Sequence, residues 1–266
     1  MPTVAFQGEP GAFSDDAART LVPGAETSGY GTFDDAAAAV QHGVVDFALL
    51  PVENSISGSV PRVYDLLWDD ERLAIVDEIV YRVVQNLIGI AGATIEGLHE
   101  IRSHAVALEQ CRRFLGAHPH AHPTIVADTA GAVREIVQLG DPAIGAIAST
   151  LAAERYGAHL LAPAIQDVGD NFTRFFLLQN IAMAKPPANG TRACVAMSLA
   201  NRPGSLRDAL GAFADEGLDL RTLVSRPSLE RPFTYRFYLE IAPVERSQLN
   251  RALAQIDGEA RVLGFY

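Results

Sequence analysis

A short proline-containing segment separates two patterned regions of the chain. It spans residues 184–190 and reads Ala-Lys-Pro-Pro-Ala-Asn-Gly. Adjacent prolines cannot continue a helix or a central strand, and this composition is typical of linkers between domains. We therefore expect two domains, residues 1–183 and 191–266, joined by a linker at 184–190. A long surface loop inside one domain is the alternative that the composition leaves open.

The region after this linker predicts six elements in the order βαββαβ. A strand is expected at 193–199, a helix from about 203, strands at 218–224 and 233–241, a helix at 244–256 and a strand at 260–265. Residues 233–241 carry an apolar side chain at every second position, which is the period of a half-buried strand. The order βαββαβ is typical of the ferredoxin-like fold.

The region before the linker alternates strands with helices, which predicts an α/β fold with a mostly parallel sheet covered on both faces. A weak internal repeat relates residues 32–51 to residues 129–148, because each reads as an Ala-rich helix, a glycine and a buried strand. Chance similarity between Ala-rich helices explains the repeat equally well. A true repeat would give two lobes, about 1–80 with 168–183 and about 81–167, and a ligand cleft between them.

The composition narrows the class of protein. Hydrophobic residues make up 48% of the 266 residues and charged residues 20%, which excludes a disordered chain or a coiled coil. The formal net charge of −11 argues against a nucleic-acid binder. The N-terminus carries neither a basic nor a long apolar segment, and Arg82, Gln85 and Asn86 interrupt the most apolar window. We therefore expect no membrane span and a cytoplasmic protein.

Four polar clusters lie at the ends of predicted strands, at residues 8–14, 51–55, 103–104 and 171–175. Ligands of open α/β sheets bind at such strand ends. Together the clusters supply carboxylate, amide, hydroxyl, imidazole and guanidinium groups, which suit an oxygen-rich anion. Taken singly, Ser14 and Ser103 could be helix N-caps and residues 54–55 a turn.

Gln110 follows Ser103 by two turns of a predicted helix, so both side chains should point to the same side. Cys111 falls on the opposite, apolar stripe and is predicted to be a core residue. The histidines between residues 118 and 122 favour a surface loop over a metal site, because the loop offers no converging acid or thiolate ligands. We expect no metal.

The polar clusters resemble the motifs of prephenate dehydratases. Residues 52–55, with 58–60 and 64–67, are similar to the family's V-E-N-S…G-x-V…D-L-L block, and residues 103–111 to its S-H-x-x-x-L-x-Q-C block. Residues 171–175 match N-x-T-R-F, the most specific motif of the set. The opening at residues 8–14 also fits, and the resemblance covers essentially the whole chain.

The C-terminal region resembles the regulatory ACT domain of the same family. Residues 203–206 stand where the family has G-A-L, and residues 225–227 where it has the end of E-S-R-P. Ser205 replaces the Ala of G-A-L, Val224 replaces the Glu of E-S-R-P, and the family's S-H-P-Q reads Ser-His-Ala-Val from residue 103. The changes in the tail bear on the strength of ligand recognition and leave the domain type unchanged.

This resemblance implies a two-lobed dehydratase region, similar to periplasmic binding proteins, with a central cleft and a C-terminal ACT domain. It implies the conversion of prephenate to phenylpyruvate, water and carbon dioxide during phenylalanine biosynthesis, a carbon–oxygen lyase reaction without a cofactor. No chorismate mutase segment precedes the dehydratase region, so we expect a monofunctional enzyme. Feedback by phenylalanine at the ACT domain, and a homodimer or homotetramer, are further expectations.

The resemblance also suggests roles for single residues. Thr173 would donate a hydrogen bond to the leaving hydroxyl, Arg174 would hold a carboxylate or brace the hinge, and Phe175 would wall the ring. The residues expected to position substrate are Gly11, Ser14, Glu53, Asn54, Ser55, Ser103, His104, Gln110 and Asn171. Those expected to bind phenylalanine are Asn201, Gly204, Ser205, Leu206, Ser225, Arg226 and Pro227.

Two alternative functions stay open from the sequence. Arogenate dehydratases share these motifs and accept an amine in place of the keto group. A non-catalytic sensor of the solute-binding-protein type would share the two lobes and the cleft. The motif at residues 173–175 favours an enzyme over a binder.

Overall fold

The structure, a computed structural model, describes residues 1–185, 190–228 and 234–266. The chain forms two compact units, Met1–Val60 with Glu78–Phe176, and Pro61–Asp77 with Leu177–Tyr266. This grouping by contact places Pro61–Asp77 with the C-terminal residues, whereas the predicted domain boundary follows the linker. That boundary stays a prediction, and residues 186–189 of the linker and Phe233 of the predicted strand lie outside the described residues.

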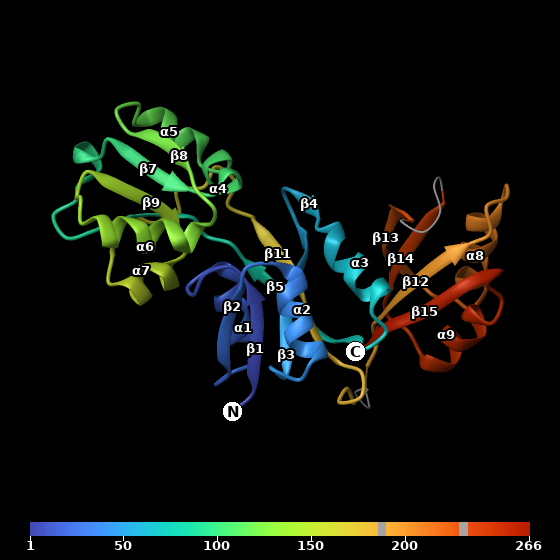
Figure 1. Ribbon diagram of the computed structural model, residues 1–266. Helices are drawn as coiled ribbons and strands as arrows, with labels where there is room; N and C mark the ends of the chain where they lie inside the picture. The colour runs from blue at the N-terminus through green and yellow to red at the C-terminus, as the bar shows by residue number, and fades with distance from the viewer. Residues whose placement is uncertain (186–189, 229–233) are drawn as a thin grey trace. The chain divides into compact units, whose positions relative to one another are not determined.

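The first unit contains two sheets, each the centre of one lobe (Figure 1). In the first lobe, β1 (Thr3–Gln7) pairs in parallel with β2 (Glu26–Tyr30) and β3 (Phe47–Asn54). The strand order continues from β3 to β11 (Phe172–Asn180) and β5 (Leu73–Arg82), and the two-residue β4 (Gly58–Ser59) pairs with β3. Helices α1 (Phe13–Leu21) and α2 (Phe33–Gln41) pack on these strands.

The sheet of the second lobe has five strands in the order β10-β6-β9-β7-β8. Their bounds are β6 Asn86–Gly89, β7 Glu100–Ser103, β8 His122–Ile125, β9 Ile144–Ala148 and β10 His159–Ala162. Every residue of β9 is buried, because Ile144, Ala146 and Ala148 pack under α6 (Thr129–Leu139) and α7 (Thr150–Tyr156), while Ile147 packs under α4 (Ala105–Glu109). A single 3-10 turn (Ile95–Gly97) and α5 (Arg112–Ala117) complete the lobe. Helices cover both faces of this sheet, as predicted. The sheet is mixed, however, where a mostly parallel one was expected, because β6 pairs antiparallel with both β9 and β10.

The two repeated segments fold alike. Helix α2 ends before Gly43, which has a φ of +68°, and the chain enters β3. Helix α6 ends at Gly140, with a φ of +67°, and the chain enters β9. Both helices start at a side-chain cap. The Thr32 side chain accepts a hydrogen bond from the Asp35 N–H, and the Asp128 side chain accepts one from the Gly131 N–H.

The second unit contains the βαββαβ order predicted from the sequence. The elements are β12 (Ala193–Leu199), α8 (Ser205–Asp215), β13 (Leu220–Pro227), β14 (Tyr235–Ile241), α9 (Arg246–Leu253) and β15 (Gly258–Phe265). Their strand order β13-β14-β12-β15 is that of a ferredoxin-like sheet, with Phe213 and Leu249 of the helices packed on its core face. In the described part of the chain, no helix is long and apolar enough to span a membrane.

Helix α3 (Pro61–Asp69) belongs to this second unit, because its side chains bond to the βαββαβ sheet. The Tyr64 hydroxyl donates to Glu240 at 3.0 Å, and the Tyr64 and Tyr238 rings lie 5.2 Å apart. Arg226 donates to the mostly buried carboxylate of Asp65 at 2.7 Å, and this hydrogen bond raises the pKa of Arg226. Arg226 was expected to face phenylalanine; in the structure it holds α3.

Asp65→Asn tests this contact, because it keeps the shape of the side chain and removes the charge that Arg226 faces. We expect the free energy of unfolding to fall by about 1–2 kcal/mol in urea denaturation, since a charge-assisted hydrogen bond is lost. Asp257→Asn is the matched control: its side chain is 70% exposed beside Arg202, so its effect should stay within about 0.5 kcal/mol. Equal losses in the two variants would contradict the packing of α3.

Candidate active site

A cavity of about 350 Å³ lies in the first unit and is lined by both lobes. Seven of the residues predicted to act in catalysis or substrate binding line it: Ser14, Asn54, His104, Gln110, Asn171, Thr173 and Phe175. They come from the start of α1, the end of β3, the start and end of α4, and β11 with the residue before it. The fold therefore brings together residues from all four polar clusters.

Asn54 is the centre of the hydrogen bonding in this cavity. Its Oδ1 accepts from the backbone N–H groups of Ile56 at 3.0 Å and Ser57 at 2.9 Å. Its Nδ2 donates to Asn171 Oδ1 at 2.8 Å and to Thr173 Oγ1 at 3.0 Å. Backbone N–H groups can only donate, so they fix which end of the Asn54 amide carries the oxygen. Thr173 Oγ1 consequently accepts from Asn54, and its own proton is available to the cavity.

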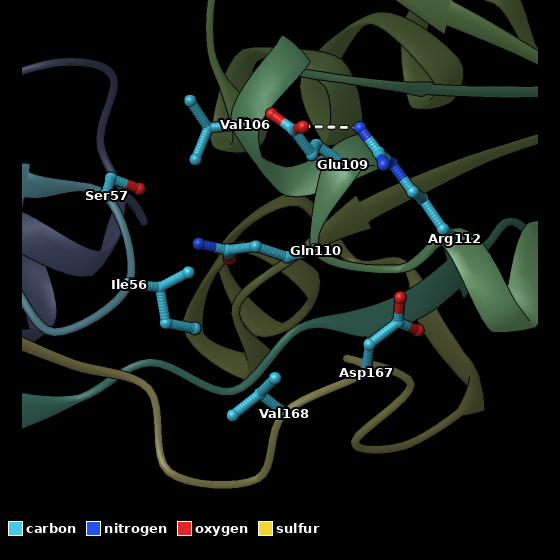
Figure 2. A pocket seen from close by; sticks show the side chains of 8 residues that line it. All are labelled: Ile56, Ser57, Val106, Glu109, Gln110, Arg112, Asp167 and Val168. Atoms are coloured by element: carbon cyan, nitrogen blue, oxygen red, sulfur yellow. Dashed lines mark hydrogen bonds and ion pairs between the residues drawn. The ribbon is translucent and has the colours of Figure 1, made fainter.

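The same order of donor and acceptor continues through a row of side-chain amides. Asn171, which is fully buried, donates from Nδ2 to Gln110 Oε1 at 2.9 Å. Gln85 donates from Nε2 to the same oxygen at 3.2 Å. Gln110 Oε1 therefore accepts two hydrogen bonds from other amides of the row. Figure 2 shows the Gln110 nitrogen extending towards Ile56 and Ser57, in a second hollow of about 550 Å³ that shares Ser57, Val106 and Gln110 with the first.

Gln85 was not predicted as a site residue. It lies just before β6, is 3% exposed, and lines the cavity. In the sequence it served only to interrupt an apolar window. A buried amide in an otherwise apolar strand region is itself an indication of a polar site, because buried polar groups need partners. Asp128 and Thr129, at the start of α6, also line the cavity and were also missed.

Successive side chains of β11 point to opposite faces of the sheet, so Arg174 points away from the cavity that Thr173 and Phe175 line. The Arg174 guanidinium lies 3.0 Å from the Glu53 carboxylate and 3.4 Å from that of Glu78. Its carbon also sits 5.3 Å above the Phe176 ring. Of the two roles expected for Arg174, the structure supports the brace, between β3 and β5. Arg174 and Glu53 are not among the cavity-lining residues, so the geometry does not support direct substrate contact by either.

Two predicted substrate-binding serines have structural partners instead. Ser103 is fully buried and donates to the carbonyl of Ile147 at 2.6 Å. It ends β7, and α4 runs only from Ala105 to Glu109, so the two-turn helix expected to align Ser103 with Gln110 does not form. Ser55 joins the end of β3 to β11, because its N–H donates to the Phe172 carbonyl at 2.8 Å and its Oγ accepts from the Phe172 N–H at 3.0 Å.

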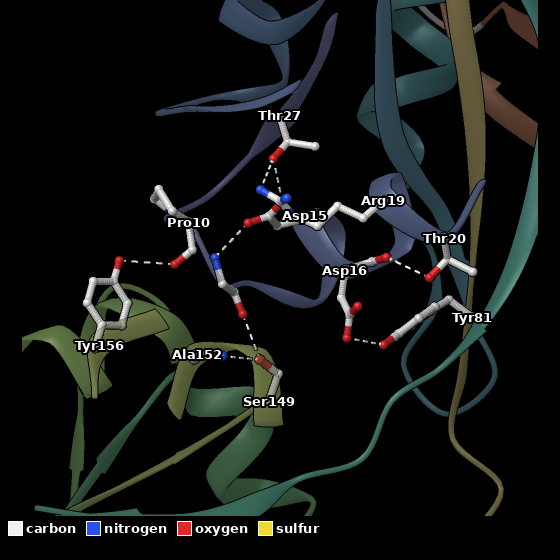
Figure 3. Close-up of polar contacts among 11 residues, drawn as sticks. Pro10, Asp15, Asp16, Arg19, Thr20, Thr27, Tyr81, Ser149, Ala152 and Tyr156 are labelled. Carbon is white, nitrogen blue, oxygen red and sulfur yellow. Dashed lines mark hydrogen bonds and ion pairs between the residues drawn. The ribbon is translucent and has the colours of Figure 1, made fainter. Parts of the chain in front are cut away.

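Gly11 makes a close contact between the lobes. Figure 3 labels the residues around it, among them Asp15, Ser149 and Ala152. The carbonyl of Gly11 accepts from the Ser149 hydroxyl at 2.6 Å, and its N–H donates to Asp15 at 2.8 Å. Its φ is +92°, and a Cβ there would lie 2.9 Å from Ala152 Cα, so only glycine fits. The N-cap of α1 is Ala12, which corrects the assignment of that role to Ser14. The Ala12 side chain makes no cap hydrogen bond, and the buried Asp15 carboxylate accepts from the Gly11 N–H, which lies before the cap.

The cavity wall offers partial positive charge and one carboxylate, that of Asp128, and none of its lining residues is an arginine. The first turns of α1, with Phe13 and Ser14, and of α6, with Thr129, lie at the wall, and helix N-termini carry partial positive charge. His104 also lines the cavity, and its Nδ1 accepts from the Val106 N–H at 3.3 Å. Cys111 is fully buried and burial raises its pKa to about 12, which confirms it as a core residue.

A smaller hollow of about 130 Å³ lies in the second unit, at the start of α8. Asn201, Ser205 and Leu206 line it, and the Ser205 hydroxyl donates to the carbonyl of Ala200 at 2.6 Å. Gly204 enters α8 with a φ of +89°. The predicted partners Ser225, Arg226 and Pro227 lie on β13 and are not among the lining residues.

The brace can be tested through stability. Arg174→Met keeps an aliphatic stem over Phe176 but leaves the Glu53 and Glu78 carboxylates without this cation, so we expect about 3 kcal/mol less stability in urea unfolding. Arg174→Lys keeps the charge and should lose less. Arg72→Met, at a pair whose arginine is 55% exposed, is the control and should change stability by less than about 1 kcal/mol. Wild-type stability in Arg174→Met would exclude the brace.

Comparison with known proteins agrees with this geometry. The family model described as prephenate dehydratase matches residues 4–182. An arogenate dehydratase/prephenate dehydratase of Arabidopsis thaliana is 36% identical over 281 residues, covering 99% of this chain and 71% of that protein. A bifunctional N-acyl-homoserine lactone acylase/prephenate dehydratase of Komagataeibacter europaeus is 35% identical over 269 residues, covering 99% of this chain and 95% of that protein.

A solved structure of prephenate dehydratase from Arthrobacter aurescens, in complex with L-Phe, superposes with a TM-score of 0.88. It is 28% identical in sequence, and the match covers 98% of this chain and 88% of the other. The family match spans the strands and helices that build the cavity, and the structural match extends through the βαββαβ unit. The chain belongs to the prephenate dehydratase family.

Proposed function

We propose that this chain is a prephenate dehydratase, a carbon–oxygen lyase that converts prephenate to phenylpyruvate, water and carbon dioxide. The observation that carries this proposal is the Thr173 hydroxyl, held by Asn54 so that its proton is available to a cavity of about 350 Å³. Such a cavity matches one small substrate. The acylase activity in the name of the Komagataeibacter protein is not proposed, because nothing in the described cavity favours it.

The reaction needs a donor at the departing oxygen. The ring carboxylate leaves as carbon dioxide, and its electron pair completes the aromatic ring and expels the hydroxyl group from the opposite ring carbon. The prephenate dianion takes up one proton, so that hydroxide leaves as water and phenylpyruvate forms as a monoanion. A threonine hydroxyl is too weak an acid to supply that proton alone, so Thr173 acts as a positioned hydrogen-bond donor while the proton arrives through a relay.

The remaining walls fit the other parts of the substrate. Phe13, Val60 and Phe175 give apolar surface for the ring, and exclusion of water there strengthens the hydrogen bonds to the leaving group. The carboxylates are attracted to the starts of α1 and α6, to His104, and to the Gln110 amide nitrogen. Arg174 contributes indirectly, because it holds the strands that carry Asn54 and Thr173.

Thr173→Val removes the hydroxyl and keeps the shape of the side chain. We expect kcat for phenylpyruvate formation to fall about 100- to 1000-fold, the usual loss for one donor at a developing anion, with the melting temperature little changed. Thr173→Ser keeps the donor and should retain most of the activity. A phenylpyruvate assay on the three purified proteins checks this. Near-wild-type turnover in Thr173→Val would refute the assignment, and no product from the wild type would refute the proposed function.

The same proposal includes feedback by phenylalanine at a C-terminal ACT domain, residues 191–266, beside a dehydratase domain of residues 1–183. The hollow at the start of α8 supports it, as does the relative solved with L-Phe. A route for coupling also exists in the chain: Val60 lines the cavity, and the next residue begins α3, which Arg226 and Glu240 hold on the βαββαβ sheet. Phenylalanine would act on the cavity through this covalent connection at Val60.

Asn201→Ala tests the effector site, since Asn201 lines the hollow at the start of α8. We expect phenylalanine to lower wild-type turnover, and the variant to need about ten times more phenylalanine for the same fractional inhibition. Dose–response curves, each normalised to the protein's own turnover without phenylalanine, give the comparison. Superimposable curves would place the effector elsewhere, and a wild type insensitive to phenylalanine would remove the regulatory proposal.

A homodimer or homotetramer is part of the same proposal. Strand β13 is the last strand in the order of the βαββαβ sheet, and Leu223 on it is 45% exposed. A second copy that pairs at this edge would cover both, in the way expected from the resemblance to ACT domains. The cytoplasmic location and the monofunctional character expected from the sequence stay predictions.

A further inference from the structure

The Gln85 side chain ends in a buried hydrogen-bond acceptor that nothing in the described part of the chain satisfies. Gln85 lines the cavity, is 3% exposed, and has no partner for Oε1. Its other polar groups are all used: the backbone N–H donates to Gln166, the carbonyl accepts from the Ile165 N–H, and Nε2 donates to Gln110. An unpaired buried acceptor is rare in folded proteins and is a reason to look for a ligand.

The orientation of this amide follows from the rest of the row. The N–H groups of Ile56 and Ser57 fix Asn54, Asn54 fixes Asn171, and Asn171 presents a donor to Gln110 Oε1. Reversing Gln85 would place its oxygen against the Gln110 oxygen, which also faces the Asn171 donor. Gln85 therefore presents an oxygen, and not a nitrogen, as its unpaired end.

The two related substrates differ in what they offer to such an oxygen. The side arm of prephenate carries a ketone and a carboxylate, which only accept hydrogen bonds. The side arm of arogenate carries an ammonium group with three donors. The ring hydroxyl, common to both, lies across the ring from this arm. Thr173 is at one end of the amide row and Gln85 at the other, so a ring whose hydroxyl meets Thr173 can extend its arm towards Gln85.

We propose that Gln85 is a specificity-determining residue, whose Oε1 accepts a hydrogen bond from the ammonium group of arogenate. This inference rests on the proposed dehydratase function. With prephenate the same oxygen stays unpaired, which costs binding that the amine would recover. The chain therefore converts arogenate to phenylalanine, water and carbon dioxide in addition to its reaction with prephenate, and Gln85 raises the ratio of the two efficiencies in favour of arogenate.

The test compares kcat/KM for both substrates in wild type and Gln85→Met. Methionine matches the length of glutamine and lacks the acceptor, so kcat/KM for arogenate should fall about 10- to 100-fold more than that for prephenate, as expected for a lost hydrogen bond to a charged group. The lost donor to Gln110 affects both substrates alike and cancels in the ratio. Gln138→Met, on the exposed side of α6, is the matched control and should leave the ratio unchanged.

Gln85→Glu is the second variant, and it keeps the assay informative if Gln85→Met is unstable. Its carboxylate accepts hydrogen bonds, attracts the ammonium group and repels a dianion, so the ratio of arogenate to prephenate efficiency should rise above that of the wild type. An unchanged ratio in Gln85→Met would overturn the inference, as would a wild type inactive on arogenate. A wild type that yields no product from either substrate would refute the proposed function itself.

Discussion

The two backbone N–H groups that hold Asn54 Oδ1 determine the chemistry of the cavity. They fix the Asn54 amide, and the amide then fixes Thr173 as an acceptor from Asn54 and a donor to the cavity. The same polarity passes through Asn171 to Gln110 and reaches Gln85. The side-chain amides in this row are neutral, and each presents a defined donor or acceptor. Burying a charged group in their place would cost far more free energy.

Strand β11 serves both chemistry and architecture because neighbouring side chains of a strand point to opposite faces. Thr173 and Phe175 line the cavity, and Arg174 between them joins Glu53 and Glu78 behind it. A motif that reads as three consecutive catalytic residues is thus divided by strand geometry. The net charge of −11 is compatible with an anionic substrate, since helix N-termini and amide nitrogens at the wall attract the carboxylates.

Much of the fold followed from local pattern. The order βαββαβ, the second-lobe sheet covered on both faces, and the helix–glycine–strand segments ending at Gly43 and Gly140 all depend on periodicity and backbone freedom, which are local properties. Ser14 as a cap was wrong because the helix begins at Phe13, so that Ser14 lies inside its first turn. Ser103 aligned with Gln110 was wrong because a tertiary contact prevailed: the Ser103 hydroxyl donates to the carbonyl of Ile147 on a neighbouring strand.

The sequence by itself determined the family, the strand and helix order, and most of the polar groups that line the cavity, because motif residues and periodicity are written along the chain. Only the tertiary structure decided which of those groups face the cavity. Arg174 does not line the cavity and pairs with Glu53, Arg226 pairs with Asp65, and Gln85 lines the cavity although it was not predicted to. These outcomes depend on partners more than 20 residues away in sequence, whose position no local pattern specifies.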